Sequence, residues 1–140
     1  MLSYAITALT HQRRSIFTRT ANADLMLELI FRQRSQDRYQ LHAFAIMPDH
    51  IHLLLTPSQD LKLSRCIQYI KGGFSHAVRD QFKSEVWHSG HYEHRIRDAE
   101  DFENQKSYIA RNPERRHLTD HLYVHTRWPD RLDPKPAHLK

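Results

Sequence analysis

Apolar and β-branched residues gather in short runs at the start and in the middle of the chain. Residues 3–10 combine aromatic and β-branched side chains and predict a first strand. Two further runs, at residues 39–47 and 50–56, flank the dipeptide Pro48-Asp49 and predict two strands joined by a tight turn. Because the turn is so short, these two strands should be antiparallel neighbours.

Apolar residues at the three- and four-residue spacing of helices follow the first and third of these strands. Asn22 is a suitable N-cap for a first helix over residues 24–38. A second helix is predicted over residues 61–82, and Gly72-Gly73 in its middle predicts a kink or a break.

The last third of the chain is less regular. Residues 86–88 and 92–97 predict short extended segments. Asp98 is a good N-cap for a third helix over residues 99–112, which we expect to end before Pro113 because the residue preceding a proline avoids the helical conformation.

The order of these elements predicts the fold. A succession β-α-β-β-α-β-α around an antiparallel sheet is typical of a ferredoxin-like α/β sandwich, with helices packed on the sheet. The length of 140 residues predicts a single domain, 1–140, with a core over about residues 3–122 and an irregular C-terminal tail over residues 123–140.

Composition favours an anionic partner. The chain has 21 Lys and Arg residues against 16 Asp and Glu, 12 His in addition, and a sequence pI of about 9.6. This balance suits nucleic acid. A membrane partner is not expected, because the basic residues are scattered and no apolar run approaches the roughly 20 residues of a membrane span.

The start of the chain and its cysteine content predict the compartment. Residues 1–6 lack the charged start and apolar core of a signal peptide, and the single Cys66 has no partner for an intramolecular disulfide. Both features favour a soluble intracellular protein.

Two histidines on the third predicted strand form the first candidate site. Side chains alternate between the two faces of a strand, so His50 and His52 should project from the same face. Two imidazoles held side by side on a strand make half of a metal site. The alternative is a pair of half-buried polar residues on a sheet.

The third predicted helix carries a second candidate pair. Tyr108 and Asn112 are four residues apart and therefore lie on one helix face. If this helix packs across the sheet, His50, His52 and Asn112 would supply two nitrogens and an oxygen to a divalent ion. The alternative for Tyr108 is a core aromatic on an amphipathic helix.

At this point an ordered set of short motifs resembles a known family. The set comprises Tyr4-x-Ile6-Thr7, Arg13-Arg14-x-x-Phe17, Met47-Pro48-Asp49-His50-Ile51-His52, Trp87 with Tyr92-x-His94-x-Ile96-Arg97-Asp98-x-x-Asp101-Phe102, and Tyr108-Ile109-x-x-Asn112-Pro113. The motifs cover about residues 3–130 and are similar to those of the single-tyrosine HUH transposases, in particular the REP-associated tyrosine transposases. Asn rather than Gln four residues after the tyrosine is similar to that branch.

The resemblance implies a ferredoxin-like fold and a divalent metal, Mg or Mn, bound by His50, His52 and Asn112. It implies that Tyr108 is the nucleophile that cleaves single-stranded DNA near hairpins through a 5′-phosphotyrosine intermediate. It further implies a cytoplasmic bacterial protein, associated with the nucleoid when bound to DNA, that acts as a monomer or a homodimer on palindromic hairpin DNA.

The chain departs from the family after Pro113. The family usually continues with a small residue and Gly before Leu, whereas this chain reads Glu114-Arg115-Arg116-His117-Leu118. The departure affects the end of the third helix and touches none of the proposed catalytic residues.

Several basic residues are candidates for phosphate contacts, although each alone is also typical of a solvated surface. These candidates are Arg13, Arg14, Lys71, Arg95, Arg97 and Arg111.

Three rival sites remain open. His88, His91 and His94, spaced three apart, are either a zinc site or incidental loop histidines. His117, His121 and His125 have helical spacing, but we favour incidental surface histidines. Tyr92 is the strongest competitor to Tyr108 for the role of nucleophile, because histidines surround it.

Two rival functions remain open. The first is a catalytically inactive module of the same fold that binds structured single-stranded DNA. The second is an unrelated metal-dependent phosphoesterase built on His50 and His52. A histidine-triad hydrolase would require a third alternating His at the position of Leu54, which makes this function the weaker alternative.

Overall fold

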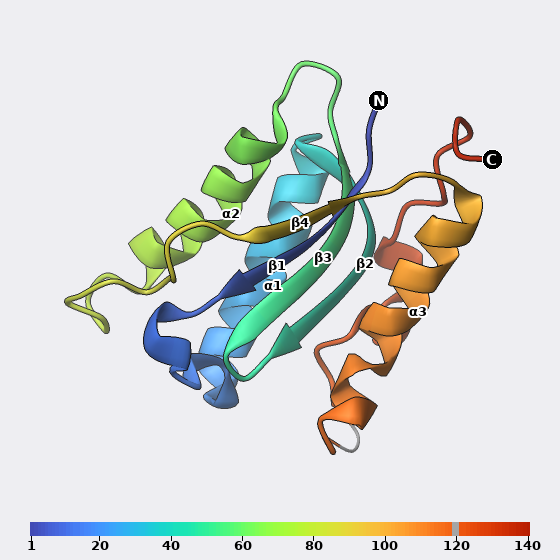
Figure 1. Cartoon of the computed structure of the whole chain (residues 1–140). Coiled ribbons are helices and arrows are strands. Elements are labelled where there is room, and N and C mark those ends of the chain that lie inside the picture. Colours follow the sequence, from blue (N-terminus) through green and yellow to red (C-terminus); the bar gives the residue numbers. More distant parts are fainter. Residues whose placement is uncertain (119–120) are drawn as a thin grey trace.

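The protein is an antiparallel sheet with helices on both faces (Figure 1). The computed structural model describes residues 1–118 and 121–140. Its main elements are β1 (Tyr4–Leu9), α1 (Thr20–Ser35), β2 (Tyr39–Met47), β3 (His50–Pro57), α2 (Leu63–Ala77), β4 (Tyr92–Arg95) and α3 (Ala99–Arg115). Four short 3-10 helices lie at His11–Arg13, Ile16–Thr18, His125–Arg127 and Pro129–Arg131. The strand order β2-β3-β1-β4, antiparallel throughout, confirms the predicted ferredoxin-like architecture.

Two separate apolar cores hold the layers together. Helices α1 and α2 pack on one face of the sheet (Figure 1), where Ile30 of α1, Phe74 of α2 and Phe44 of β2 belong to one buried apolar cluster. Helix α3 packs on the other face, where Phe102 and Ile109 form a smaller core with residues of β2 and β3. Since helices cover both faces, the sequences of β2 and β3 are nearly continuous apolar runs rather than an alternation of apolar and polar residues.

The C-terminal segment covers the free edge of β2. The Ile46 amide donates to the Tyr123 carbonyl at 2.8 Å, and the Asp133 amide donates to the Leu41 carbonyl at 2.7 Å. The Asp133 carboxylate also forms an ion pair with Arg34 on α1, at 2.9 Å. Within residues 121–140 this segment has two short 3-10 helices and an isolated β-bridge from Val124 to Ala45, and it satisfies backbone groups that an exposed edge strand would leave unpaired. In the part of the chain that the structure describes, no helix is both long and apolar enough to cross a membrane.

Helix α2 differs from its predicted form. It ends at Ala77 rather than near residue 82, and it runs through Gly72 and Gly73 without a break. A Cβ atom at position 73 would lie 3.1 Å from Cδ1 of Leu29 on α1, so Gly73 allows the two helices to approach closely. The prediction of a kink or break was therefore wrong, because this glycine serves packing between helices.

The predicted N-cap of α1 was also wrong. The helix begins at Thr20, and Asn22 lies buried in its first turn. The side-chain Nδ2 of Asn22 donates to the Ile16 carbonyl at 2.9 Å and to Oε1 of Gln81 at 3.0 Å. Asn22 thus joins α1 to the turn before it and to the chain after α2.

Helix α3 continues past the predicted stop. It includes Pro113 and ends at Arg115, so the prediction that it ends before the proline was wrong. Pro113 lies near the C-terminal end of the helix, where only one intrahelical bond is lost, the one that its missing N–H would make. The end is closed by two hydrogen bonds, from the His117 amide to the Glu114 carbonyl at 3.0 Å and from the Leu118 amide to the Pro113 carbonyl at 2.8 Å. This arrangement is a Schellman motif.

The Schellman motif lies where the sequence departs from the family it resembles. His117 has φ 60°, the left-handed conformation that this motif places just beyond the helix. The family usually has glycine before the leucine, which corresponds to this position. A histidine here carries the steric cost of the left-handed region, on the order of 1–2 kcal/mol.

We predict that His117→Gly raises the free energy of unfolding by about 0.5–1 kcal/mol, since relief of the left-handed strain exceeds the added entropy of the unfolded chain. Urea unfolding followed by circular dichroism measures the change. Arg116→Gly is the matched control, because Arg116 has φ −97° and should gain nothing from glycine. A His117→Gly protein that is less stable than the parent would contradict this account of the helix end.

Candidate functional site

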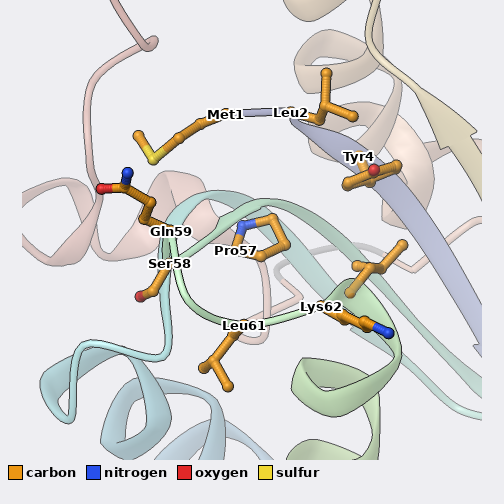
Figure 2. Close-up of a pocket in the computed structure, with 9 residues that line it drawn as sticks. Met1, Leu2, Tyr4, Pro57, Ser58, Gln59, Leu61 and Lys62 are labelled. Atoms are coloured by element: carbon orange, nitrogen blue, oxygen red, sulfur yellow. The ribbon is translucent and has the colours of Figure 1, made fainter.

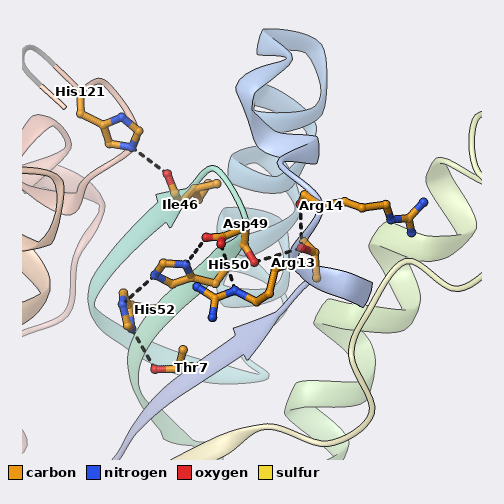
Figure 3. Close-up of polar contacts among 9 residues, drawn as sticks. Thr7, Arg13, Arg14, Ile46, Asp49, His50, His52 and His121 are labelled. Atoms are coloured by element: carbon orange, nitrogen blue, oxygen red, sulfur yellow. Dashed lines mark hydrogen bonds and ion pairs between the residues drawn. The ribbon is translucent and has the colours of Figure 1, made fainter. Parts of the chain in front are cut away.

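His50 and His52 lie together on the sheet face that α3 covers (Figure 3). Both side chains are buried, and their Nε2 atoms are 3.1 Å apart. Two ligand nitrogens at right angles, each about 2.1 Å from one cation, are separated by roughly 3.0 Å. The spacing of the two nitrogens is therefore compatible with a shared metal ion.

Neighbouring groups fix the orientation of both rings. Nδ1 of His50 lies 2.6 Å from Oδ1 of Asp49, and Nδ1 of His52 lies 2.9 Å from Oγ1 of Thr7 on β1. An ionised carboxylate only accepts, so Nδ1 of His50 carries the proton and its Nε2 presents a lone pair. Metal-binding histidines are commonly held in this tautomer by such a carboxylate.

Burial keeps the two imidazoles neutral. It lowers the pKa of His52 to about 3, with further lowering by the nearby His50 and Arg116. Burial also lowers the pKa of His50, although the Asp49 carboxylate acts in the opposite direction. Burial alone would raise the pKa of Asp49, but hydrogen bonds from His50 and Arg13 bring it below its ordinary value. At neutral pH the site therefore has two neutral imidazoles and one carboxylate.

Tyr108 stands next to this pair. Its ring centroid is 6.0 Å from that of His52, and the guanidinium of Arg115 lies 4.7 Å from the Tyr108 ring centre. The side chain is 40% exposed, so Tyr108 is not the core aromatic of the alternative interpretation. A surface hollow adjoins it, lined by Asn104, Gln105, Ser107, Tyr108 and Arg111.

Asn112 is buried one turn further along α3. It lies between Tyr108, which contacts His52, and Arg116, whose charge acts on both histidines. Its Oδ1 atom is buried and accepts no hydrogen bond from any residue that the structure describes. An unsatisfied buried oxygen costs free energy, and amide oxygens are ordinary ligands of divalent cations. The donor set of His50, His52 and Asn112 thus fits a divalent cation.

The rival histidine clusters do not form sites. Within residues 1–118 and 121–140, no three His, Cys, Asp or Glu side chains are arranged to hold a metal. His91 is paired with Glu93 at 3.0 Å, and His94 is paired with Asp101 at 2.8 Å.

The histidines near the C-terminus do not share a helix. Helix α3 ends at Arg115, before His117. Nε2 of His121 lies 2.7 Å from the Ile46 carbonyl, and Nδ1 of His125 lies 3.1 Å from the Phe44 carbonyl. These two rings attach the C-terminal segment to β2. His125 is buried, so the interpretation of this group as incidental surface histidines was wrong for His125.

Tyr92 remains the second tyrosine near the histidine pair. On β4 it pairs with Thr7, which also pairs with His52, so the three residues form one row across the sheet. Its side chain is 65% exposed. The structure therefore places both tyrosines on the same face, and Tyr108 contacts the ring of His52, with 6.0 Å between the ring centroids.

The predicted phosphate-binding residues fall into two groups. Arg13, Arg14 and Lys71 make contacts within the fold: Nε of Arg13 donates to Asp49 at 2.9 Å, and Nζ of Lys71 donates to the His88 and Gly90 carbonyls at 3.1 and 3.0 Å. Arg14 donates to the Glu85 carbonyl. The remaining candidates, Arg95, Arg97 and Arg111, are exposed, and Nε of Arg97 also lies 3.6 Å from Oδ2 of Asp101.

Sequence reasoning missed four residues of the site: Thr7, Asp49, Arg115 and Arg116. Asp49 had a local signal, because a carboxylate directly before a candidate metal-binding His is a common orienting partner. Thr7 and the two arginines had none, since their proximity depends on how β1 and α3 pack.

Another hollow lies at the other end of β1 and β3, near the N-terminus (Figure 2). It is lined by Met1, Leu2, Tyr4, Pro57, Ser58, Gln59, Leu61, Lys62 and Leu63. Tyr4 pairs with Leu55, whereas Leu9 pairs with His50 at the opposite end. This hollow contains none of the predicted site residues.

Comparison with known proteins defines the class. The sequence model of the family described as "Transposase IS200 like" matches residues 1–112, and the chain belongs to this family. A protein of Haemophilus influenzae described as a REP-associated tyrosine transposase is 33% identical over an alignment of 87 positions, which covers 54% of this chain and 49% of that protein. The chain thus spans about half the length of this curated relative.

Solved structures agree with this class. A REP-associated tyrosine transposase bound to a REP hairpin superposes with a TM-score of 0.77 at 27% identity, over 95% of this chain and 82% of that one. A Deinococcus radiodurans protein described as a transposase shares the fold, with a TM-score of 0.54 at 18% identity over 76% of this chain and 87% of that one. The family resemblance inferred from the motifs is confirmed.

Buried neutral histidines make the stability of the metal-free protein depend on pH. The folded His52 has a pKa of about 3, whereas an unfolded His binds a proton below about pH 6.5, so the unfolded chain takes up more protons between these values. We therefore predict that stability falls on acidification, by about 2 kcal/mol at pH 5 from His52 alone. Burial lowers the pKa of His42, His50 and His125 as well, which acts in the same direction.

Urea unfolding at pH 7.5 and pH 5.0 in the presence of EDTA measures this loss. His52→Gln should reduce the loss, whereas His138→Gln, at an exposed position, should leave it unchanged. Equal stability at both pH values would show that the buried rings are not held neutral.

Proposed function

We propose that this chain is a metal-dependent endonuclease and strand transferase for single-stranded DNA, which cleaves near DNA hairpins through a 5′-phosphotyrosine on Tyr108. The observation that carries the proposal is the juxtaposition of an exposed phenol with two converging imidazole nitrogens. The hairpin bound to the similar solved structure supports hairpin DNA as the substrate.

His50, His52 and Asn112 are the residues that would hold the cation. When bound, a divalent cation would polarise a non-bridging phosphate oxygen and stabilise the negative charge that develops on attack. Of the two expected metals, Mn suits imidazole ligands better than Mg.

Tyr108 would perform the covalent step. Its phenolic oxygen attacks the scissile phosphorus and loses its proton, while the bond from phosphorus to the 3′ oxygen breaks and that oxygen leaves as a 3′-OH. The product is a 5′-phosphotyrosine. Because a phosphodiester replaces a phosphodiester, attack by another 3′-OH rejoins the strand without ATP.

Positive charge beside Tyr108 would hold the phosphate. The guanidinium of Arg115 lies over the Tyr108 ring, and the charge of Arg116 acts on both histidines. The exposed Arg111 lines the same hollow as Tyr108. Phosphate contacts of this kind fix the register of the strand without reading its sequence.

We predict that Tyr108→Phe abolishes the covalent protein–DNA adduct and leaves hairpin affinity within about twofold of the parent, because only the nucleophilic oxygen is lost. The assay incubates labelled hairpin DNA that has single-stranded flanks with Mn²⁺ or Mg²⁺, followed by a denaturing gel. Tyr92→Phe is the matched control and should retain the adduct.

An adduct that persists in Tyr108→Phe and disappears in Tyr92→Phe would assign the reaction to Tyr92. Tight hairpin binding by the parent chain without an adduct in either metal would favour the catalytically inactive binding module.

The Asn112→Leu variant tests whether Asn112 is a metal ligand or a residue that only stabilises the fold. We predict that this variant is at least as stable as the parent in EDTA, because an unsatisfied buried oxygen costs about 1–3 kcal/mol. We also predict that it loses most of the rise in Tm caused by Mn²⁺, because a ligand is missing. Thermal unfolding with and without Mn²⁺ measures both effects.

His50→Ala should abolish the Mn²⁺ effect, and Asn104→Leu, at an exposed position on the same helix, should preserve it. If Asn112→Leu retained the full rise in Tm, Asn112 would not be a ligand.

A further inference from the structure

We infer that Arg13 is a positioning residue of the metal site, acting through Asp49 to hold His50 in its metal-binding orientation and thereby raising the affinity for the cation. This inference rests on the proposed function, since it assumes a cation at His50 and His52. It assigns to Arg13 a role other than the phosphate contact expected from the sequence.

A continuous chain of polar contacts supports this role (Figure 3). Nε of Arg13 donates to Oδ2 of Asp49 at 2.9 Å, and Oδ1 of Asp49 accepts from Nδ1 of His50 at 2.6 Å. Each carboxylate oxygen thus has its own donor, so the position of Asp49 is fixed from both sides. Nε2 of His50 then points at Nε2 of His52.

The carboxylate lies where solvent cannot easily replace these contacts. The side chains of His50 and Asp49 are 5% and 13% exposed, whereas that of Arg13 is 52% exposed. Interactions between partly buried charges are screened much less than those at the surface. Loss of the Arg13 contact should therefore change the position of Asp49 and His50, because water cannot readily replace that contact.

The backbone is shaped to bring Arg13 to this place. Gln12 and Arg13 have φ values of 56° and 55°, a conformation that costs a non-glycine residue about 1–2 kcal/mol. Two consecutive residues of this kind persist only where surrounding contacts determine them. The Thr10 amide donates to the Asp49 carbonyl at 3.0 Å, and the Phe17 amide donates to the Pro48 carbonyl at 3.0 Å. The segment from Thr10 to Phe17 is therefore hydrogen-bonded at both of its ends to the Pro48-Asp49 turn.

The adjacent arginine points elsewhere. Arg14 donates to the Glu85 carbonyl, and its guanidinium lies 5.3 Å from the ring centre of Phe82. The two neighbouring arginines thus have the same charge but different partners. Arg14 provides a matched control for Arg13.

The test is Mn²⁺ binding to the full chain without DNA, measured by titration with detection of free Mn²⁺ by electron paramagnetic resonance. Asp49→Asn should weaken binding by about 10- to 100-fold, the usual effect of losing an orienting partner. Arg13→Gln should weaken it by a smaller factor, on the order of 3- to 10-fold. In the double variant the Arg13 substitution should add nothing to the effect of Asp49→Asn, because its action passes through that carboxylate.

Two further variants keep the result interpretable. Arg13→Gly removes the same side chain and adopts a positive φ without strain, so its weaker Mn²⁺ binding would not result from misfolding. Arg14→Gln should bind Mn²⁺ within about twofold of the parent, which would tie the effect to the contact with Asp49.

Three outcomes would overturn the inference. Unchanged Mn²⁺ affinity in Arg13→Gln and Arg13→Gly, with weaker hairpin binding, would make Arg13 a DNA contact. If Arg13→Gln weakened Mn²⁺ binding by the same factor in the parent chain and in Asp49→Asn, action through the carboxylate would be excluded. Absence of Mn²⁺ binding by the parent chain would instead overturn the proposed metal site itself, and this result is distinguishable from the other two.

Discussion

The burial of two imidazoles side by side on a central strand is the constraint on which the rest of the site depends. Buried polar groups must find partners, and two charged rings at 3.1 Å would repel each other. The fold meets both demands by keeping His50 and His52 neutral and by giving each Nδ1 a partner, Asp49 for one and Thr7 for the other. The two Nε2 atoms are left facing each other, and the ring of Tyr108 lies 6.0 Å from that of His52.

Helix α3 joins the stability of the fold to the chemistry of the site. Its apolar side, with Phe102 and Ile109, forms the core on that face of the sheet. The side that bears Tyr108 and Asn112 approaches the histidine pair. Since a helix and a central strand supply the proposed ligands and nucleophile, their relative positions do not depend on a flexible loop.

How much of this arrangement could be predicted depends on how far apart in the sequence the interacting residues lie. Alternation along a strand placed His50 and His52 on one face, and helical spacing placed Tyr108 with Asn112; both are local rules, and the structure agrees with both. Whether α3 would lie over these histidines was left open by the pattern. It depends on the packing of residues far apart in the sequence.

The errors have the same origin. Asn22 looked like a cap but makes a contact with Gln81, which is 59 residues away. The helix α3 that continues past Pro113 is closed by the left-handed His117, a conformation that a sequence rule assigns to glycine rather than to histidine. In each case a general propensity was overruled by one specific partner or by one backbone conformation.

A third buried histidine shows what distinguishes a structural imidazole from a functional one in this fold. His42 is fully buried, and burial lowers its pKa as it does for His50 and His52. Both of its nitrogens have partners within the fold, Nδ1 with the Asp133 carbonyl at 3.0 Å and Nε2 with the Thr56 hydroxyl at 2.8 Å. His50 and His52 instead have only each other at Nε2, and the Oδ1 of Asn112 on the helix above that face has no partner in the described chain. Since a fold under selection for stability alone would pair a buried oxygen of this kind, the unused bonding capacity of Asn112 favours a ligand at this site.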